Sequence, residues 1–160
     1  MADLTIRDRQ PADLPTCVAV LTEVHRHDRY PLNWPADPGG WLSPAGILRA
    51  WVAELPAGAV VGHVALHQAT GGAEVSRLFV APTARGHHVG ARLLSHARRW
   101  AAAHRLDLTL EIVDESRSAP AIALYERTGW RHVDTVTATW SGPDGQPVRL
   151  RRYRTDPASA

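Results

Sequence analysis

The chain contains no lysine and only one cysteine, and these shortages exclude several kinds of protein. With Cys17 alone, no disulfide can form within the chain, so we expect a reducing compartment and a cytoplasmic location. No apolar run approaches the roughly 18 residues that a membrane-spanning helix needs. The first residues, MADLTIRDRQ, are polar and do not read as a signal peptide. We therefore expect no membrane partner.

An excess of charge of one sign is also missing, since 18 basic residues stand against 16 acidic ones, for a net charge of +2. Every basic side chain other than histidine is arginine, and the arginines are spread along the chain. One tight cluster is formed by Arg149, Arg151, Arg152 and Arg154. Nucleic-acid-binding proteins concentrate basic charge on one face, with aromatic or motif support. We expect no nucleic-acid partner.

Motifs for metal binding and for hydrolysis are absent as well. Although the chain has nine histidines, none forms a cluster with ligand spacing. His63 and His67 would stand about 13 Å apart on a strand and could not share one ion. No Gly-x-Ser-x-Gly sequence, Cys-His pair or Walker loop occurs. We expect no metal and no hydrolase chemistry.

What is present indicates one α+β (mixed α/β) domain over residues 1–155, followed by a frayed tail at 156–160. Alternating patterns predict strands and 3.6-residue periods predict helices. The expected strands are 4–9, 50–55, 60–67, 74–80, 108–113, 130–140 and 148–154, and the expected helices are 14–24, 89–101 and 120–128. Residues 28–43 hold three prolines, two glycines and two tryptophans without either period, so we expect a long loop there.

The most informative segment is 78–94, which reads as a strand, a turn and the start of a helix. Amides at a helix start lack intrahelical partners, and the helix dipole adds partial positive charge there. A phosphate can therefore be bound by main chain alone, provided that glycines let the backbone approach. Gly86 and Gly90 meet that requirement, so the segment predicts an anion-binding site.

Two motifs in this region resemble those of the GNAT superfamily of N-acetyltransferases. The sequence RGHHVG at 85–90 follows the pyrophosphate-loop pattern Arg/Gln-x-x-Gly-x-Gly/Ala, with His88 in place of the first glycine. We expect His88 to hold a helical conformation with its side chain outward. The sequence SAPAIALYERTGW at 118–130 is similar to Asn-x-x-Ala-x-x-Leu-Tyr-Glu-x-x-Gly-Phe, with Ser118 in place of asparagine. The resemblance covers residues 50–140.

The resemblance implies a GNAT-like fold, in which a central, mostly antiparallel, seven-stranded sheet is flanked by helices and opens into a V-shaped cleft for CoA. It implies acetyl-CoA as co-substrate, with the amides of residues 86–91 on the pyrophosphate. The backbone of Phe79 and Val80 would pair with the pantetheine arm as an added strand. The implied CoA-binding residues are Phe79, Val80, Arg85, Gly86, His87, His88, Val89, Gly90, Ala91 and Ser118.

The same resemblance assigns catalytic roles. Tyr125 occupies the position of the general acid that protonates the departing thiolate, and a phenol is protonated at neutral pH. Glu74, on the strand that leads to the loop, is the candidate base for the amine, with Glu111 as the alternative. The Val80 amide is the candidate oxyanion donor. Together these residues imply direct attack of a primary amine in a ternary complex.

The acceptor is less well specified. Tyr30, Trp34 and Trp41, beside Asp28 and Asp37, could form an aromatic wall with anionic tips, which suits a small cationic amine. These tryptophans could equally anchor the long loop onto the core. A peptide or ribosomal-protein acetyltransferase and a non-catalytic, acyl-CoA-binding regulatory domain are alternatives. The chain could act alone or as a homodimer.

Overall fold

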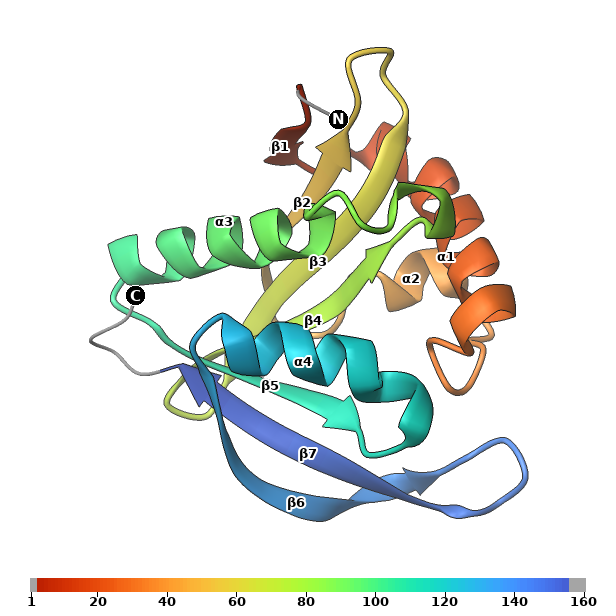
Figure 1. The fold of residues 1–160 in the computed structure, drawn as a ribbon, viewed down its shortest axis with the longest axis vertical. Helices are drawn as coiled ribbons and strands as arrows, with labels where there is room; N and C mark the ends of the chain where they lie inside the picture. Colours follow the sequence, from red (N-terminus) through yellow and green to blue (C-terminus); the bar gives the residue numbers. More distant parts are fainter. Residues whose placement is uncertain (1–2, 156–160) are drawn as a thin grey trace.

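The computed structural model describes residues 3–155, and the expected tail at 156–160 lies outside this range. The helices and strands alternate much as their sequence periods predict (Figure 1). The strands are β1 (Thr5–Asp8), β2 (Ile47–Glu54), β3 (Val60–Ala69), β4 (Gly72–Val80), β5 (Asp107–Val113), β6 (Trp130–Ser141) and β7 (Pro147–Thr155). The α-helices are α1 (Leu14–Asp28), α2 (Pro38–Trp41), α3 (Val89–Ala103) and α4 (Ala119–Arg127), and the 3-10 turns are η1 (Pro11–Asp13), η2 (Pro82–Ala84) and η3 (Ser116–Ser118).

The seven strands form one sheet in the order β1-β2-β3-β4-β5-β7-β6. Every neighbouring pair is antiparallel except β4 and β5, which run parallel. The expected α+β fold with a mostly antiparallel, seven-stranded sheet is confirmed, and the sheet is mixed because of this one pair. A parallel pair needs a long crossover, and α3 provides it.

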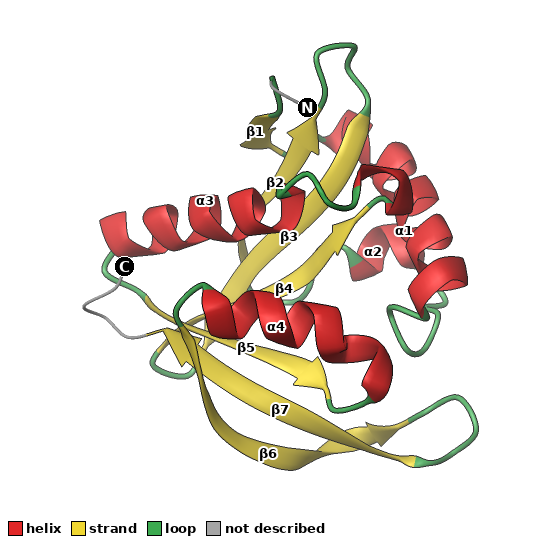
Figure 2. Ribbon diagram, in the orientation of Figure 1, coloured by secondary structure: helices red, strands yellow, loops and turns green. Residues whose placement is uncertain are grey.

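Helices cover the sheet on both faces (Figure 2). The larger core lies beneath α3 and α4, where Val89, Leu93 and Ala97 of α3 are buried. The smaller core lies beneath α1, where Leu21 and Val24 pack with Phe79 of β4. Both cores reach β4, so this strand is held from both sides.

Close approach of α3 to the sheet depends on one glycine. A Cβ atom at Gly62 on β3 would lie 2.9 Å from Cδ1 of Leu93 and 3.0 Å from Cγ1 of Val89. Contacts this short do not occur in packed proteins, so a larger residue would push the start of α3 away from the sheet. The position of the α3 N-terminus is thereby fixed relative to β3 and β4.

The expected long loop at 28–43 is partly wrong, because α1 continues to Asp28 and α2 occupies Pro38–Trp41. The carboxylate of Asp37 accepts a hydrogen bond from the amide of Gly40 (3.1 Å) and caps α2. A helix of four residues is too short to show a hydrophobic period, so sequence reasoning missed it. Within residues 3–155, no helix is long and apolar enough to cross a membrane.

Candidate active site

The sheet opens between β4 and β5. These strands pair only where Gly72–Val75 lies beside Asp107–Leu110. Beyond that point β4 pairs with β3 alone, and residues 111–113 of β5 pair with β7 alone. The two strands diverge in a V, which is visible in Figure 1 where they part below α3.

A β-bulge lies at the opening of this V. His63 is opposite Phe79 and Ala65 is opposite Ser76, so β4 carries one extra residue over this stretch. Arg77 takes the left-handed conformation, with φ of 55°. Its carbonyl accepts a hydrogen bond from Nδ1 of His63 (2.8 Å), and its Nε donates to the carbonyl of Trp41 (2.9 Å). Side-chain contacts therefore hold the bulge in place.

Val80 turns its peptide groups toward the V. The amide of Ala81 donates to the carbonyl of Val61 (2.8 Å), so the facing pair Val80 and Gly62 is a non-hydrogen-bonded pair of the antiparallel ladder. The N–H and C=O of Val80 consequently point away from β3, to the side that β5 has left. By the same alternation the backbone of Phe79 faces β3, so the expectation that it would pair with the pantetheine arm is wrong. Its buried ring stacks on His63 with centroids 5.1 Å apart.

The segment of residues 85–91, called here the anion loop, joins η2 to the first turn of α3. Gly86 has φ of 81°, and His88, the N-cap residue, has φ of 61° and ψ of 21°. His88 is thus left-handed rather than helical as expected, which is the conformation that a glycine at this position of the motif adopts without strain. The first turn of α3 has no side-chain cap and no acidic residue, so its amides can receive an anion.

The Arg85 side chain makes two contacts with other groups of the protein. Its guanidinium forms an ion pair with Asp28 at the end of α1 (2.5 Å), and its Nε donates to the carbonyl of Val80 (3.0 Å). Partial burial would raise the pKa of Asp28, but hydrogen bonds from Arg85 and His27 outweigh it and lower that pKa. In this structure Arg85 links α1 to the end of β4.

Tyr125 projects from α4 into the core beneath it. Its ring is 7% exposed and packs against Trp130 and Tyr153, with centroid distances of 6.2 and 6.0 Å. Burial raises its pKa above the usual range for a phenol, and the nearby phenols of Tyr30 and Tyr153 raise it further. Its hydroxyl forms no hydrogen bond with any residue that the structure describes. A protonated, uncommitted phenol is a suitable proton donor.

Tyr30 approaches the same region from the other face of the sheet. It packs edge-on against Trp41 (6.1 Å), and burial raises its pKa to about 12 while the charge of Arg77 opposes the rise. The Arg77 guanidinium lies 4.0 Å from the centre of the Trp41 ring. Tyr30 and Trp41 both pack against the smaller core, which contains Phe79 of β4.

Glu74 lies on β4 just before the strands part. Burial, followed by repulsion from Glu111, raises its pKa to about 7, and the charge of Arg77 opposes the rise. Nε2 of His67 is 3.8 Å from its carboxylate. A carboxylate that titrates near neutral pH can accept a proton from an ammonium group. The alternative base, Glu111, is exposed to solvent.

Other residues singled out from the sequence lie elsewhere. Trp34 is 40% exposed and packs on His25 rather than on Tyr30 or Trp41. Asp28 and Asp37 are engaged by Arg85 and by the α2 cap, so an aromatic wall with two free anionic tips does not form. Ser118 precedes α4 without capping it, and His87 is exposed.

The arginine cluster near the C-terminus is divided between the two faces of β7. Arg151 pairs with Glu126 of α4 (3.4 Å), and Arg152 pairs with Asp134 on β6 (2.5 Å). Side chains on a strand alternate between faces, so these arginines do not form one basic patch. In the described part of the chain, no group of three His, Cys, Asp or Glu residues is arranged to hold a metal ion.

Sequence reasoning missed the residues that support the bulge. Arg9 donates to the carbonyl of Leu42 (2.8 Å) and lies 3.0 Å from Nε2 of His63. An arginine can only donate, so Nε2 accepts and Nδ1 carries the proton that it shares with the carbonyl of Arg77. Burial lowers the pKa of His63 to about 4, which agrees with a neutral ring. No sequence signal marks these contacts, because they join three distant segments.

Comparison with known proteins identifies the domain. A family model described as "Acetyltransferase (GNAT) domain" matches residues 47–132. Among curated proteins, no sequence match was found.

Solved structures share the fold across nearly the whole chain. An N-acetyltransferase from Staphylococcus aureus is 19% identical, with a TM-score of 0.79, and the match covers 97% of this chain and 99% of that one. A putative phosphinothricin N-acetyltransferase is 23% identical, with a TM-score of 0.78 and coverage of 96% and 98%. A ribosomal-protein-alanine N-acetyltransferase from Brucella melitensis is 24% identical, with a TM-score of 0.76 and coverage of 94% and 98%.

Proposed function

The chain belongs to the GNAT acetyltransferase family, and from this premise we propose that it transfers the acetyl group of acetyl-CoA to the primary amine of a small molecule. It is an acetyltransferase, as its family is. The observation that carries the proposal is the opening of the sheet between β4 and β5, with three candidate groups on the elements that border it. These are the inward-facing amide of Val80, a carboxylate whose pKa lies near 7 and a buried phenol.

The residues at the V and at the start of α3 fit CoA. The uncapped amides of the anion loop suit a pyrophosphate. The C=O of Val80 can accept a hydrogen bond from an amide N–H of the extended pantetheine arm, as it would from a further strand, and this leaves the Val80 N–H for the oxyanion. Arg85 now occupies that carbonyl, so it would be displaced toward the phosphates, where it could form a charge-assisted contact. Acetyl-CoA itself supplies the acetyl group as an activated thioester.

The protein's residues then provide each proton transfer. Glu74 accepts a proton from the ammonium group of the acceptor, so that the free amine can attack the carbonyl carbon. The Val80 amide stabilises the oxyanion that forms. As the carbon–sulfur bond breaks, Tyr125 gives its proton to the departing sulfur. The nitrogen of the product still carries one surplus proton, which it passes to the phenolate, so Tyr125 is restored and the neutral amide forms. Glu74 releases its proton to solvent.

Two alternatives differ in their measurable outcome. A peptide or ribosomal-protein acceptor would be acetylated while small amines are not, and a regulatory domain would bind CoA without turnover. We favour a small acceptor because the segment after α1 is joined to the β6–β7 hairpin, where the Asn33 side chain donates to the carbonyl of Ser141 (2.8 Å). A cytoplasmic location, from the single cysteine, belongs to the same proposal, and so does the possibility of a homodimer.

Replacement of Tyr125 by phenylalanine tests the mechanism. Tyr125→Phe removes only the proton donor, so kcat for thiol release should fall by about two orders of magnitude while the Kd for acetyl-CoA stays unchanged. Tyr153→Phe is the matched control, because that buried hydroxyl donates to Glu126 (2.9 Å) and has no role in the reaction. Equal turnover in wild type and Tyr125→Phe would remove the general-acid assignment.

A further inference from the structure

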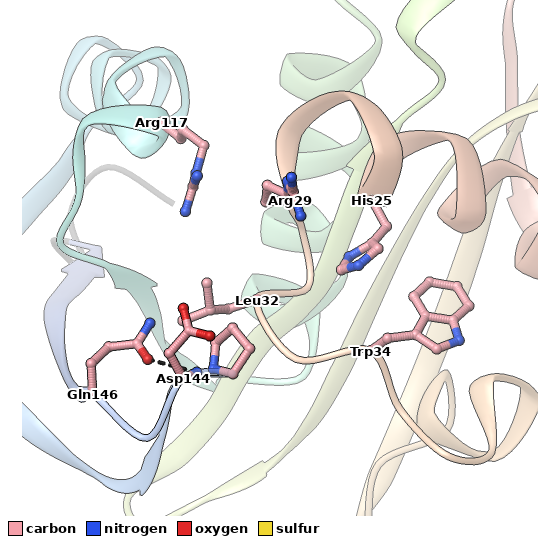
Figure 3. A pocket seen from close by; sticks show the side chains of 8 residues that line it. His25, Arg29, Leu32, Trp34, Arg117, Asp144 and Gln146 are labelled. Carbon is pink, nitrogen blue, oxygen red and sulfur yellow. Dashed lines mark hydrogen bonds between the residues drawn. The ribbon is translucent and has the colours of Figure 1, made fainter.

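A cavity of about 440 Å³ lies where three segments far apart in the sequence converge. One wall is the end of α1 and the residues after it, including Arg29 and Trp34. A second is η3, with Arg117, and the third is the β6–β7 turn, with Asp144. Figure 3 shows Arg29 and Arg117 reaching toward the same space from two elements.

Arg29 is an unusual residue for its position. It ends α1 in the left-handed conformation, with φ of 60° and ψ of 32°, and its amide donates to the carbonyl of His25 (2.9 Å). Glycine or asparagine normally occupies this position, because other residues are strained there. The Arg29 guanidinium forms no hydrogen bond or ion pair with any residue in 3–155. A strained backbone that presents an unpaired cation to a cavity indicates a role for the side chain.

Arg117 is oriented from the opposite wall. Its Nε and one terminal nitrogen donate to the two carboxylate oxygens of Glu115, at 3.0 and 3.2 Å. Glu115 itself does not line the cavity. The ion pair therefore fixes one edge of the guanidinium and leaves its other terminal nitrogen available to a ligand.

Positive charge predominates in the cavity. Two guanidinium groups face one carboxylate, that of Asp144, while Leu32, Pro143 and the Trp34 ring supply apolar surface. A guanidinium matches the geometry of a carboxylate or phosphate-type oxyanion, with two parallel hydrogen bonds. A polycation would meet repulsion here. The small cationic amine expected from the sequence therefore does not suit this cavity.

Three consecutive residues connect the cavity to the reaction. Asp28 binds Arg85 of the anion loop, Arg29 faces the cavity, and Tyr30 packs against the smaller core that contains Phe79 of β4. A small ligand bound by Arg29 would therefore be held by the residue between Asp28, which contacts the anion loop, and Tyr30.

We propose that this cavity is the acceptor's anion subsite, in which Arg29 and Arg117 bind a carboxylate or similar oxyanion of the amine to be acetylated. This rests on the proposed acetyltransferase function and narrows it. The acceptor is an amine that also carries an oxyanion, such as an amino acid, and not a polyamine or an uncharged amine.

The test is thiol release from acetyl-CoA with the twenty common amino acids, their carboxamides and spermidine. An accepted amino acid should have a KM at least about tenfold lower than its carboxamide, since a charge-assisted hydrogen bond is lost in the amide. Amino acids and carboxamides used equally well, or spermidine preferred, would overturn the subsite and leave the acetyltransferase function intact.

Arg29→Gly is the informative variant, because it removes the guanidinium and relieves backbone strain at once. Its melting temperature should rise while its KM for the amino acid rises about tenfold, with the KM for acetyl-CoA unchanged. Arg105→Gly is the matched control, since Arg105 is left-handed (φ 57°) and exposed but lies away from the cavity. It should gain stability with no change in KM. Arg117→Gln should repeat the KM effect of Arg29→Gly.

A panel without any turnover would count against the proposed function, and the subsite is then decided by binding. Inorganic phosphate would be titrated calorimetrically into protein saturated with CoA, so that the anion loop is occupied. Binding that is lost in Arg29→Gly but kept in Arg105→Gly supports the subsite. Absence of phosphate binding, or binding that Arg29→Gly retains, contradicts it.

Discussion

Glu74 shows how its surroundings convert an ordinary side chain into a base. A carboxylate in water is too weak a base to deprotonate an amine efficiently near neutral pH, and burial beside Glu111 raises the pKa of Glu74 to about 7. Above that pH the carboxylate is ionised and able to accept a proton. The residue type was evident from the sequence, but its pKa depends on neighbours that only the fold assembles.

Glu74→Gln should therefore lower kcat/KM by about two orders of magnitude. In the wild type, kcat/KM should rise with pH through about 7 as Glu74 ionises, and this step should be missing in the variant. Glu111→Gln is the control, because it replaces the alternative, exposed carboxylate. If Glu111→Gln is the variant that loses activity and the pH step, the base has been assigned to the wrong residue.

The same variant has a predicted effect on stability. Because its pKa is raised in the folded state, Glu74 is neutral in the folded protein below about pH 7. Above that pH the folded protein must bury an ionised carboxylate, which lowers the free energy of unfolding. The free energy of unfolding of the wild type should fall as the pH rises from about 4.5, the pKa of this carboxyl in the unfolded chain, to about 7. Above pH 7, the free energy of unfolding of Glu74→Gln, measured with urea, should exceed that of wild type by up to about 3 kcal/mol. This difference should disappear in acid.

His88 carries strain that a glycine would not. It is left-handed at the N-cap of α3, and that conformation costs roughly 1–2 kcal/mol in residues other than glycine. His88→Gly also increases the freedom of the unfolded chain, so a net gain of about 0.5 kcal/mol is expected in urea unfolding. Arg105→Gly should gain a similar amount. A loss of stability in His88→Gly would mean that the imidazole makes a contact that outweighs the strain.

At the scale of elements, the start of α3 is the part on which CoA binding depends. A Cβ atom at Gly90 would be 3.5 Å from Leu124 and 3.7 Å from Val80, which are ordinary contacts. Gly90→Ala should therefore fold normally and retain CoA. Gly90→Glu adds bulk and negative charge beside the expected pyrophosphate and should abolish acetyl-CoA binding in a calorimetric titration. Normal affinity in Gly90→Glu would show that the phosphates bind elsewhere.

The sequence predicts well those helices and strands whose apolar residues recur at a regular spacing. The strands and the helices α1, α3 and α4 were all expected, and no end is displaced by more than four residues. The short helix α2 was not expected, and a bulge on β4 was implied only by the family resemblance, because neither feature repeats along the sequence. The bulge depends on a single left-handed residue held by His63 and Trp41, and no local pattern marks an arginine for that conformation.

The candidate site divides in the same way. Glu74, Val80 and Tyr125 were named from the family resemblance; the structure places the first two on β4 and the third on α4, and their roles stay predictions. The acceptor side could not be predicted, since the cavity is built from residues near 29, 117 and 144, which meet only in the folded chain. Trp34 was assigned to a wall with Tyr30 and Trp41, but the turn after α1 directs it to the cavity instead.

At the scale of the whole molecule, the residues proposed for CoA and those proposed for the acceptor come from different faces of the sheet. The anion loop begins α3 and Tyr125 lies on α4, on one face of the sheet, whereas Arg29 and Tyr30 follow α1, which covers the other face (Figure 1). The cavity lies where the end of α1 meets η3 and the β6–β7 turn. The two substrates would therefore approach from opposite faces and meet where β4 and β5 diverge. This arrangement favours direct transfer in a ternary complex, because neither substrate needs to leave before the other enters.

Calorimetric titration of acetyl-CoA into the purified protein, followed by thiol release with amine acceptors in the same preparation, tests the central claim most directly. We predict one saturable site per chain and release of thiol that depends on an acceptor amine. Binding without release in the presence of amino acids, other small amines or peptides would contradict catalysis and favour a regulatory domain. Absence of any acetyl-CoA binding would contradict the proposed acetyl-CoA-dependent function itself.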